Sequence, residues 1–209
     1  MRTLALLFAL SPALALAQTS SEADSLLARQ LSHRVEADQA ARGLITLALR
    51  QGRQPDAADG AFALAIDSLN TAWLKGVVAE RGWPKASEVG EQGASDAWLL
   101  VQHADRDRAF QREVLGLMEA AVAEGEASGS DFAYLTDRVR LAAGEPQVYG
   151  TQFKVVDGAP EPRELEDPDG VDARRAAVGL QPLAEYLESF RQRVLGGAAS
   201  DETEDEQTP

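Results

Sequence analysis

The chain contains no cysteine, which excludes disulfide bonds, thiolate metal sites and a cysteine-linked lipid anchor. It has only two histidines, His33 and His103, and aromatic residues make up 6% of its 209 residues. Basic residues are also scarce, since 20 Lys and Arg face 34 Asp and Glu and the formal net charge is −14. Such a charge repels nucleic acid and anionic membranes, so neither is an expected partner.

Long apolar runs are missing apart from residues 4–10, which follow Arg2 and precede a small-residue pattern that ends at Ala17. This order is that of a secretory signal peptide with its cleavage site. The run is too short for a membrane span, which needs about 20 residues. We therefore expect residues 1–17 to be removed, leaving a protein that begins at Gln18, is exported to the periplasm or the medium, and does not insert into a membrane.

Hydrophobic residues recur at three- and four-residue steps over most of the remaining chain, as in amphipathic helices. The pattern changes at residues 147–166, where β-branched and aromatic residues flank Asp157–Gly158, a strong hairpin signal. The sequence thus predicts one mainly α domain over residues 18–196, an irregular bundle of about six to seven helices with one β-hairpin. Residues 197–209 are acidic without large apolar residues and predict a disordered tail. Expected helices cover about 21–51, 59–81, 95–104, 107–125, 131–143 and 171–178, with a last one from 182.

The densest group of ionisable residues follows the apolar end of the predicted helix 95–104. It contains His103 and Asp105. Because imidazole titrates near neutral pH, His103 is a candidate general acid or base, with Asp105 as its catalytic partner. The alternative is structural: His103 ends one helix and Asp105 caps the next.

Polar residues also interrupt two helical stripes that should face the core. Asp38 and Arg42, four positions apart, lie on the stripe of the first helix, and Asn70 lies on that of the second. Buried charges and amides need partners. These residues therefore form either a structural pair within the bundle or the polar edge of a site.

The hairpin is the one predicted non-helical element able to wall a cavity, and two arginines follow it in the chain. An arginine fork can hold a carboxylate or phosphate while amides orient it. We predict that His103 shares one pocket with the hairpin and an arginine, and that Trp83 stands at its edge unless it plugs the core. The predicted ligand-binding residues are Trp83, Gln102, Gln147, Tyr149, Gln152, Arg174, Arg175, Asp38, Arg42 and Asn70. The alternative is that the hairpin residues only tie the hairpin to the bundle.

Several short motifs occur in order along the chain. They are Gly82-Trp83-Pro84, Gln102-His103-Ala104-Asp105, Tyr134-Leu135-Thr136-Asp137-Arg138, Tyr149-Gly150-Thr151-Gln152, Glu166-Asp167-Pro168 and the segment 171–180. Together they resemble one bacterial family, known as domain of unknown function 6624. The resemblance extends from about Asp38 to Tyr186. It implies kinship, but no reaction, cofactor or catalytic set.

The sequence lacks a phosphate-binding glycine loop and a serine nucleophile elbow, and two histidines without thiols make a poor metal set. We therefore expect no metal and no cofactor. The favoured function is a small-molecule pocket built on His103 for an anionic or zwitterionic ligand, in a cofactor-independent hydrolase or lyase. A non-catalytic ligand-binding protein and a protein-interaction module are the alternatives. The sequence does not predict the oligomeric state.

Overall fold

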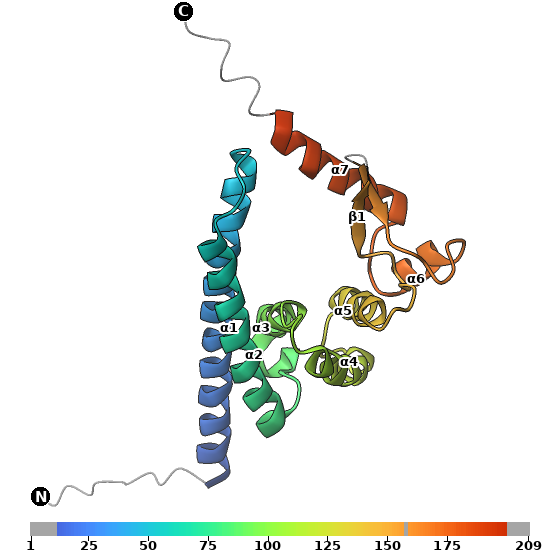
Figure 1. The fold of residues 1–209 in the computed structure, drawn as a ribbon. Coiled ribbons are helices and arrows are strands. Elements are labelled where there is room, and N and C mark those ends of the chain that lie inside the picture. Colours follow the sequence, from blue (N-terminus) through green and yellow to red (C-terminus); the bar gives the residue numbers. More distant parts are fainter. Residues whose placement is uncertain (1–11, 157–158, 200–209) are drawn as a thin grey trace, which may run out of the picture.

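The structure is a computed structural model that describes residues 12–156 and 159–199. Within these ranges the chain forms seven helices and one two-stranded antiparallel sheet, which confirms the predicted mainly α fold with a hairpin (Figure 1). The elements are α1 (Pro12–Arg50), α2 (Ala57–Arg81), α3 (Ala86–Gln102), α4 (Arg108–Ala123), α5 (Gly129–Ala142), β1 (Phe153–Val156), β2 (Ala159–Pro162), α6 (Val171–Ala177) and α7 (Leu183–Ala199).

The two longest helices, α1 and α2, form an antiparallel hairpin, and α3 packs against both of them. Figure 1 shows that α3 covers one side of this hairpin and that α4 and α5 follow beyond it. The core lies where these helices meet, because their apolar stripes converge there. Its fully buried side chains include Leu31, Leu74, Leu100, Phe110, Val114, Met118 and Leu135.

The segment before the predicted helix 95–104 differs from the expectation. Residues 85–93 were expected to form a loop, but α3 already begins at Ala86. Its first turn is set at an angle to the rest because Gly90 has a φ of 77°, a left-handed conformation that glycine adopts without strain. The preceding helix ends where it was expected to end, since α2 stops at Arg81 and Gly82 follows with a φ of 78°.

A short turn joins α3 to α4 and places His103 at the C-terminal cap of α3. The expected cap of the next helix, Asp105, does not cap it. Asp107 does, because it directly precedes the first turn and accepts a hydrogen bond from the Phe110 N–H at 3.0 Å. Asp105 is left on the outside of the turn.

Both strands are shorter than expected. The pairing runs from Phe153 opposite Pro162 to Val156 opposite Ala159. The residues before β1 instead wrap around Asp137, a fully buried carboxylate on α5. Asp137 accepts hydrogen bonds from three backbone N–H groups, those of Val148, Tyr149 and Thr151, at 2.7, 3.0 and 2.8 Å. Those groups therefore bond to α5 and not to a second strand.

Two predictions concern the chain ends. Residues 1–11 of the expected signal peptide and 200–209 of the expected tail lie outside the described residues. α1 begins at Pro12 and includes the expected cleavage position after Ala17, and α7 continues to residue 199. Among the helices in the described ranges, none is long and apolar enough to cross a membrane.

Candidate functional site

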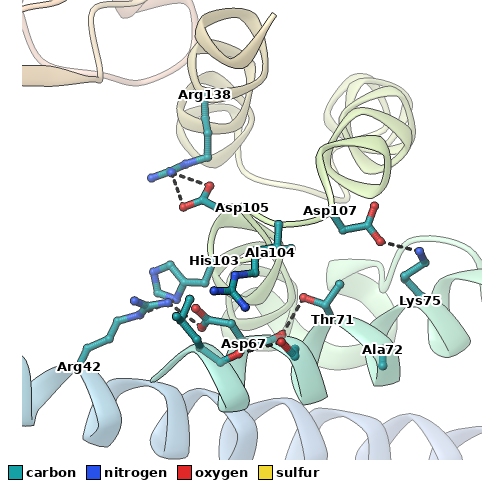
Figure 2. A pocket seen from close by; sticks show the side chains of 13 residues that line it. Arg42, Asp67, Thr71, Ala72, Lys75, His103, Ala104, Asp105, Asp107 and Arg138 are labelled. Carbon is teal, nitrogen blue, oxygen red and sulfur yellow. Dashed lines mark hydrogen bonds and ion pairs between the residues drawn. The ribbon is translucent and has the colours of Figure 1, made fainter. Parts of the chain in front are cut away.

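A pocket of about 620 Å³ lies between the α1–α2 hairpin, the turn from α3 to α4, and α5. Its size suits a small molecule, since such sites typically enclose about 300–1,000 Å³. Figure 2 shows side chains of α1 and α2 along one wall, with the turn and α5 opposite. The lining residues are Arg42, Leu64, Asp67, Ser68, Thr71, Ala72, Lys75, His103, Ala104, Asp105, Arg106, Asp107 and Arg138.

His103 is held by a carboxylate behind the pocket wall. Its Nδ1 lies 2.8 and 2.9 Å from the two carboxylate oxygens of Asp38 on α1. The side chain of Asp38 is 1% exposed, whereas that of His103 is 19% exposed and reaches the pocket. Helix packing thus joins a buried carboxylate to a partly accessible imidazole.

The contacts of Nδ1 determine where the imidazole proton lies. The Arg42 Nε is 3.0 Å from Nδ1, but a nitrogen that donates to Asp38 cannot also accept from Arg42. A buried carboxylate only accepts, so the proton belongs on Nδ1, and Arg42 bonds to Asp38 Oδ1 at 3.4 Å. Nε2 then has a free lone pair. Among the described residues it has no hydrogen-bond partner, which leaves it for a ligand in the pocket.

Arg42 connects this pair to a second carboxylate. Its Nη2 donates to Asp67 Oδ1 on α2 at 2.7 Å. The expected pairing of Asp38 with Arg42 is therefore present, at 3.4 Å, as one part of a four-residue network. We call Asp38, Arg42, Asp67 and His103 the His103 network.

The environment shifts the two carboxylates in opposite directions. Burial raises the pKa of Asp38, but the hydrogen bond and charge of His103, with Arg42 and Gln39, outweigh burial and hold this pKa below its ordinary value. Burial raises the pKa of Asp67 above its ordinary value, and the charges of Arg42 and His103 offset this only in part. Divergent pKa values of neighbouring acids are typical of acid–base sites.

The same residues include a possible set of metal ligands. Asp38, Asp67 and His103 each offer one ligand atom, and these atoms lie within 4.8 Å of one another. The guanidinium of Arg42 contacts all three side chains and supplies the positive charge that the carboxylates require. A divalent ion would therefore have to displace Arg42.

The rim of the pocket is built from charged pairs and one unpaired cation. Arg138 bonds to the side chain of Gln102. It also bonds to Asp105, and Lys75 lies 2.6 Å from Asp107 (Figure 2). Arg106 also lines the pocket, is exposed, and forms no hydrogen bond or ion pair with any residue that the structure describes. The rim thus presents one uncompensated guanidinium to a ligand.

Of the predicted residues next to Arg138, Asp105 lines the pocket and Gln102 does not. Asp105, expected to be catalytic, is 62% exposed, pairs with Arg138 at 2.9 Å and makes no hydrogen bond with His103 among the described side chains. Gln102 is buried and accepts from Arg138. The structure thus places both next to Arg138, and the carboxylate that holds His103 is Asp38.

The predicted residues of the hairpin region lie elsewhere. None of them lines the pocket of His103, so the predicted shared pocket is not found in the described part of the chain. These residues are Gln147, Tyr149, Gln152, Arg174 and Arg175. The side chains of Gln147, Arg174 and Arg175 bond to backbone carbonyls, because the irregular segment around residues 147–152 has backbone groups that need partners. The side chain of Gln152 donates to Thr151 Oγ1 at 3.2 Å.

The buried side chains of this region show the pattern. Gln147 donates to the carbonyls of Gln152 and Arg163 at 3.1 and 2.9 Å. Arg175, which is 1% exposed, donates to the carbonyl of Tyr149 at 2.7 Å, and Arg174 donates to that of residue 148 at 2.9 Å. These side chains therefore fasten the segment 147–152 to the hairpin and to α6.

Two further predicted residues are buried in the bundle. Trp83 is 5% exposed and belongs to the hydrophobic core, as its alternative role of a plug requires. Asn70 is 4% exposed and accepts a hydrogen bond from Arg34 at 3.0 Å, on the side of α2 away from the pocket. Neither lines the pocket of His103.

The sequence did not predict a role in the site for Asp67, Lys75, Arg106 or Arg138, which line the pocket. Asp67 directly follows Ile66 on the apolar stripe of α2 and precedes Asn70 by three residues. That spacing was the available signal, because it puts a carboxylate on the flank of a core-facing stripe. The partners of Asp67 come from other helices, so the sequence alone did not reveal the pairing.

Comparison with known proteins gives one match. The model of the family described as "Family of unknown function (DUF6624)" matches residues 25–195. No curated protein and no solved structure matches the chain. The matched segment contains every residue of the His103 network and the hairpin.

Proposed function

The chain belongs to the DUF6624 family, and we propose that it binds a small anionic molecule in the pocket of His103 and performs acid–base chemistry on it without a cofactor. One observation supports this most strongly: Asp38 holds Nδ1 of His103 at 2.8 Å while Nε2 has no partner in the described structure. An imidazole oriented by a buried carboxylate is a common general base.

In the proposed mechanism Nε2 of His103 accepts a proton, and Asp38 stabilises the imidazolium that forms. Arg42 contacts the carboxylates of both Asp38 and Asp67 and keeps them in place. Asp67 lines the pocket and has a raised pKa because it is buried. The imidazolium of His103 can then return its proton to the product.

The proton can come from water or from the ligand. The two hydroxyl side chains of the pocket, Ser68 and Thr71, donate to backbone carbonyls four residues earlier, at 2.8 and 2.7 Å. Neither is paired with His103, so the pocket has no activated hydroxyl nucleophile. This arrangement supports a hydrolase that activates water or a lyase that removes a proton from carbon.

The lining also supports the ligand class. Arg106 has no ionic partner among the residues that the structure describes, and its guanidinium suits a carboxylate or a phosphate. Leu64, Ala72 and Ala104 supply an apolar wall. We therefore infer a ligand with one acidic group and a short apolar part, acted on outside the cytoplasm after removal of residues 1–17.

The test uses a panel of small carboxylates and phosphate monoesters, with binding followed by thermal shift and conversion followed by ¹H NMR of each compound. His103→Asn retains a side-chain N–H that can face Asp38 but removes Nε2, so it should fold, bind and fail to convert the compound. His33→Asn is the matched control, because His33 is 79% exposed and lies outside the pocket.

Binding without conversion by the wild type would identify the alternative, a non-catalytic ligand-binding protein. If no member of the panel binds, or if His33→Asn reduces conversion as much as His103→Asn does, the proposed site is wrong.

A further inference from the structure

The α1–α2 hairpin has a second face, opposite to the one that carries α3 and the pocket. Figure 1 shows no element of the described chain against this side of the two helices. Large apolar side chains are nevertheless exposed there: Leu44 is 45% exposed, Phe62 49% and Leu69 64%. A contiguous exposed apolar patch marks an interaction surface, whereas singly exposed apolar residues do not.

Helical spacing places these side chains on one surface. On α2, Phe62, Ile66 and Leu69 follow one another at steps of four and three residues. On α1, Leu44 lies seven residues, or about two turns, after Ala37. Ala37, Ile66 and Leu69 line a groove of about 320 Å³ along the seam of the two helices. We call this surface the seam face.

The charge of the hairpin end limits what can bind there. Residues 34–69, which span the seam face, contain four arginines against one glutamate and four aspartates, so this segment has a net charge of only −1, whereas the whole chain has a net charge of −14. The net negative charge makes two copies of the chain repel each other over most of their surfaces. This repulsion is weak at the nearly neutral seam face. A strongly basic partner would find no acidic patch at this place.

The seam face is also complementary to itself. Its charged ends differ: Arg34 lines the groove at one end, and Asp59 stands in the first turn of α2 near the other. In a two-fold antiparallel contact each Arg34 would approach the opposite Asp59. Small side chains such as Ala37 and Ala65 would lie between the large ones of the partner.

We propose that two copies of this chain associate through their seam faces and form a four-helix arrangement of two α1–α2 hairpins. This contact is independent of the proposed chemistry, because the pocket opens on the opposite side of the hairpin. It would cover apolar side chains that the single chain leaves exposed.

The test is sedimentation equilibrium of the purified protein and its variants at chain concentrations up to about 100 μM, where an association of micromolar strength is complete. We expect a dimer for the wild type and monomers for Phe62→Glu and Leu69→Glu. Leu49→Glu is the matched control: Leu49 is 57% exposed but lies about 140° around α1 from Leu44, so this variant should remain dimeric.

A cross-link gives a second readout that does not depend on a charge placed in the face. The chain has no cysteine, so a single one reports without background. Ala65→Cys, which lies three residues after Phe62 and four before Leu69 on α2, should oxidise to a disulfide-linked dimer, whereas Ser68→Cys on the pocket side should not. A monomeric wild type, or a dimer that Phe62→Glu and Leu49→Glu affect equally, would overturn the proposal. So would a monomer that binds lipid vesicles through Phe62, which would assign the face to a membrane surface.

Discussion

Nδ1 of His103 lies 2.8 Å from Oδ1 of Asp38, although the two residues are 65 positions apart in the chain. The contact joins the C-terminal end of α3 to the middle of α1. Asp38 is almost completely buried, whereas His103 reaches a pocket. The packing of α1 against α3 therefore determines the orientation of the imidazole, and changes to Asp38 should affect both stability and chemistry.

The pH dependence of stability follows from the lowered pKa of Asp38. Its stabilising contribution is complete above the pKa of the unfolded chain, about 3.9, and is lost as the pH falls through the lower folded value. Asp38→Asn should cost about 3 kcal/mol at pH 7, because His103 and Arg42 lose their buried partner. In urea melts, the free energy of unfolding should fall less between pH 7 and pH 3.5 for Asp38→Asn than for the wild type. An equal fall in both proteins would contradict this role of Asp38.

Asp137 should be among the most sensitive positions of the C-terminal half. Asp137→Ala leaves three backbone N–H groups and the Thr151 hydroxyl without their acceptor, and for the buried Thr151 groups each such loss costs about 1–3 kcal/mol. We expect a loss of at least about 3 kcal/mol in urea unfolding. Asp105→Asn is the comparison, because its exposed ion pair with Arg138 should contribute under about 1 kcal/mol. Similar losses for the two variants would refute the structural role of Asp137.

The hairpin should not take part in binding. Tyr149→Phe and Gln152→Ala change side chains outside the pocket, so the affinity for the panel compounds should stay within about twofold, an effect well under 1 kcal/mol. Isothermal titration calorimetry measures this affinity. A strong loss of affinity in Tyr149→Phe or Gln152→Ala would return the hairpin to the site.

Arg106 should contribute to binding but not to stability. Arg106→Met should weaken binding about tenfold without a change in melting temperature, because Arg106 is exposed and unpaired among the described residues. The same calorimetric titration measures the loss, and an unchanged affinity would contradict this role of Arg106.

Export should remove the first segment of the chain. The small-residue pattern up to Ala17 predicts that the exported protein begins at Gln18. Intact mass spectrometry of protein from the periplasm or the medium measures this directly. Protein that keeps residues 1–17, or that stays in the cytoplasm, would contradict the proposed location.

Helical periodicity predicted much of the fold because burial of one helix face depends on local spacing. It also identified His103, Asp38 and Arg42 as unusual, since charged residues rarely lie on a core-facing stripe. Periodicity does not report which stripes meet. The carboxylate that bonds to His103 was therefore assigned to Asp105, its neighbour in sequence, although Asp38 on α1 makes this contact.

The hairpin region was misjudged for a related reason. The residue type of polar side chains such as Gln147 and Arg175 does not reveal whether they bind a ligand or backbone carbonyls. The decisive contacts are the bonds of Arg175 to the carbonyls of Tyr149 and Gln181, which depend on tertiary structure. A buried acceptor such as Asp137 can also be recognised only when its donors are located.

The tautomer of His103 tests the central claim most directly. Long-range ¹H–¹⁵N NMR of protein labelled at histidine resolves two imidazoles, and exposed His33 serves as the internal reference. At a pH where the ring is neutral, we predict a proton on Nδ1 of His103 and none on Nε2, with Nε2 shifting when a panel compound binds while His33 does not move. A proton on Nε2, or shifts of equal size at both histidines, would contradict an acid–base site built on Asp38 and His103.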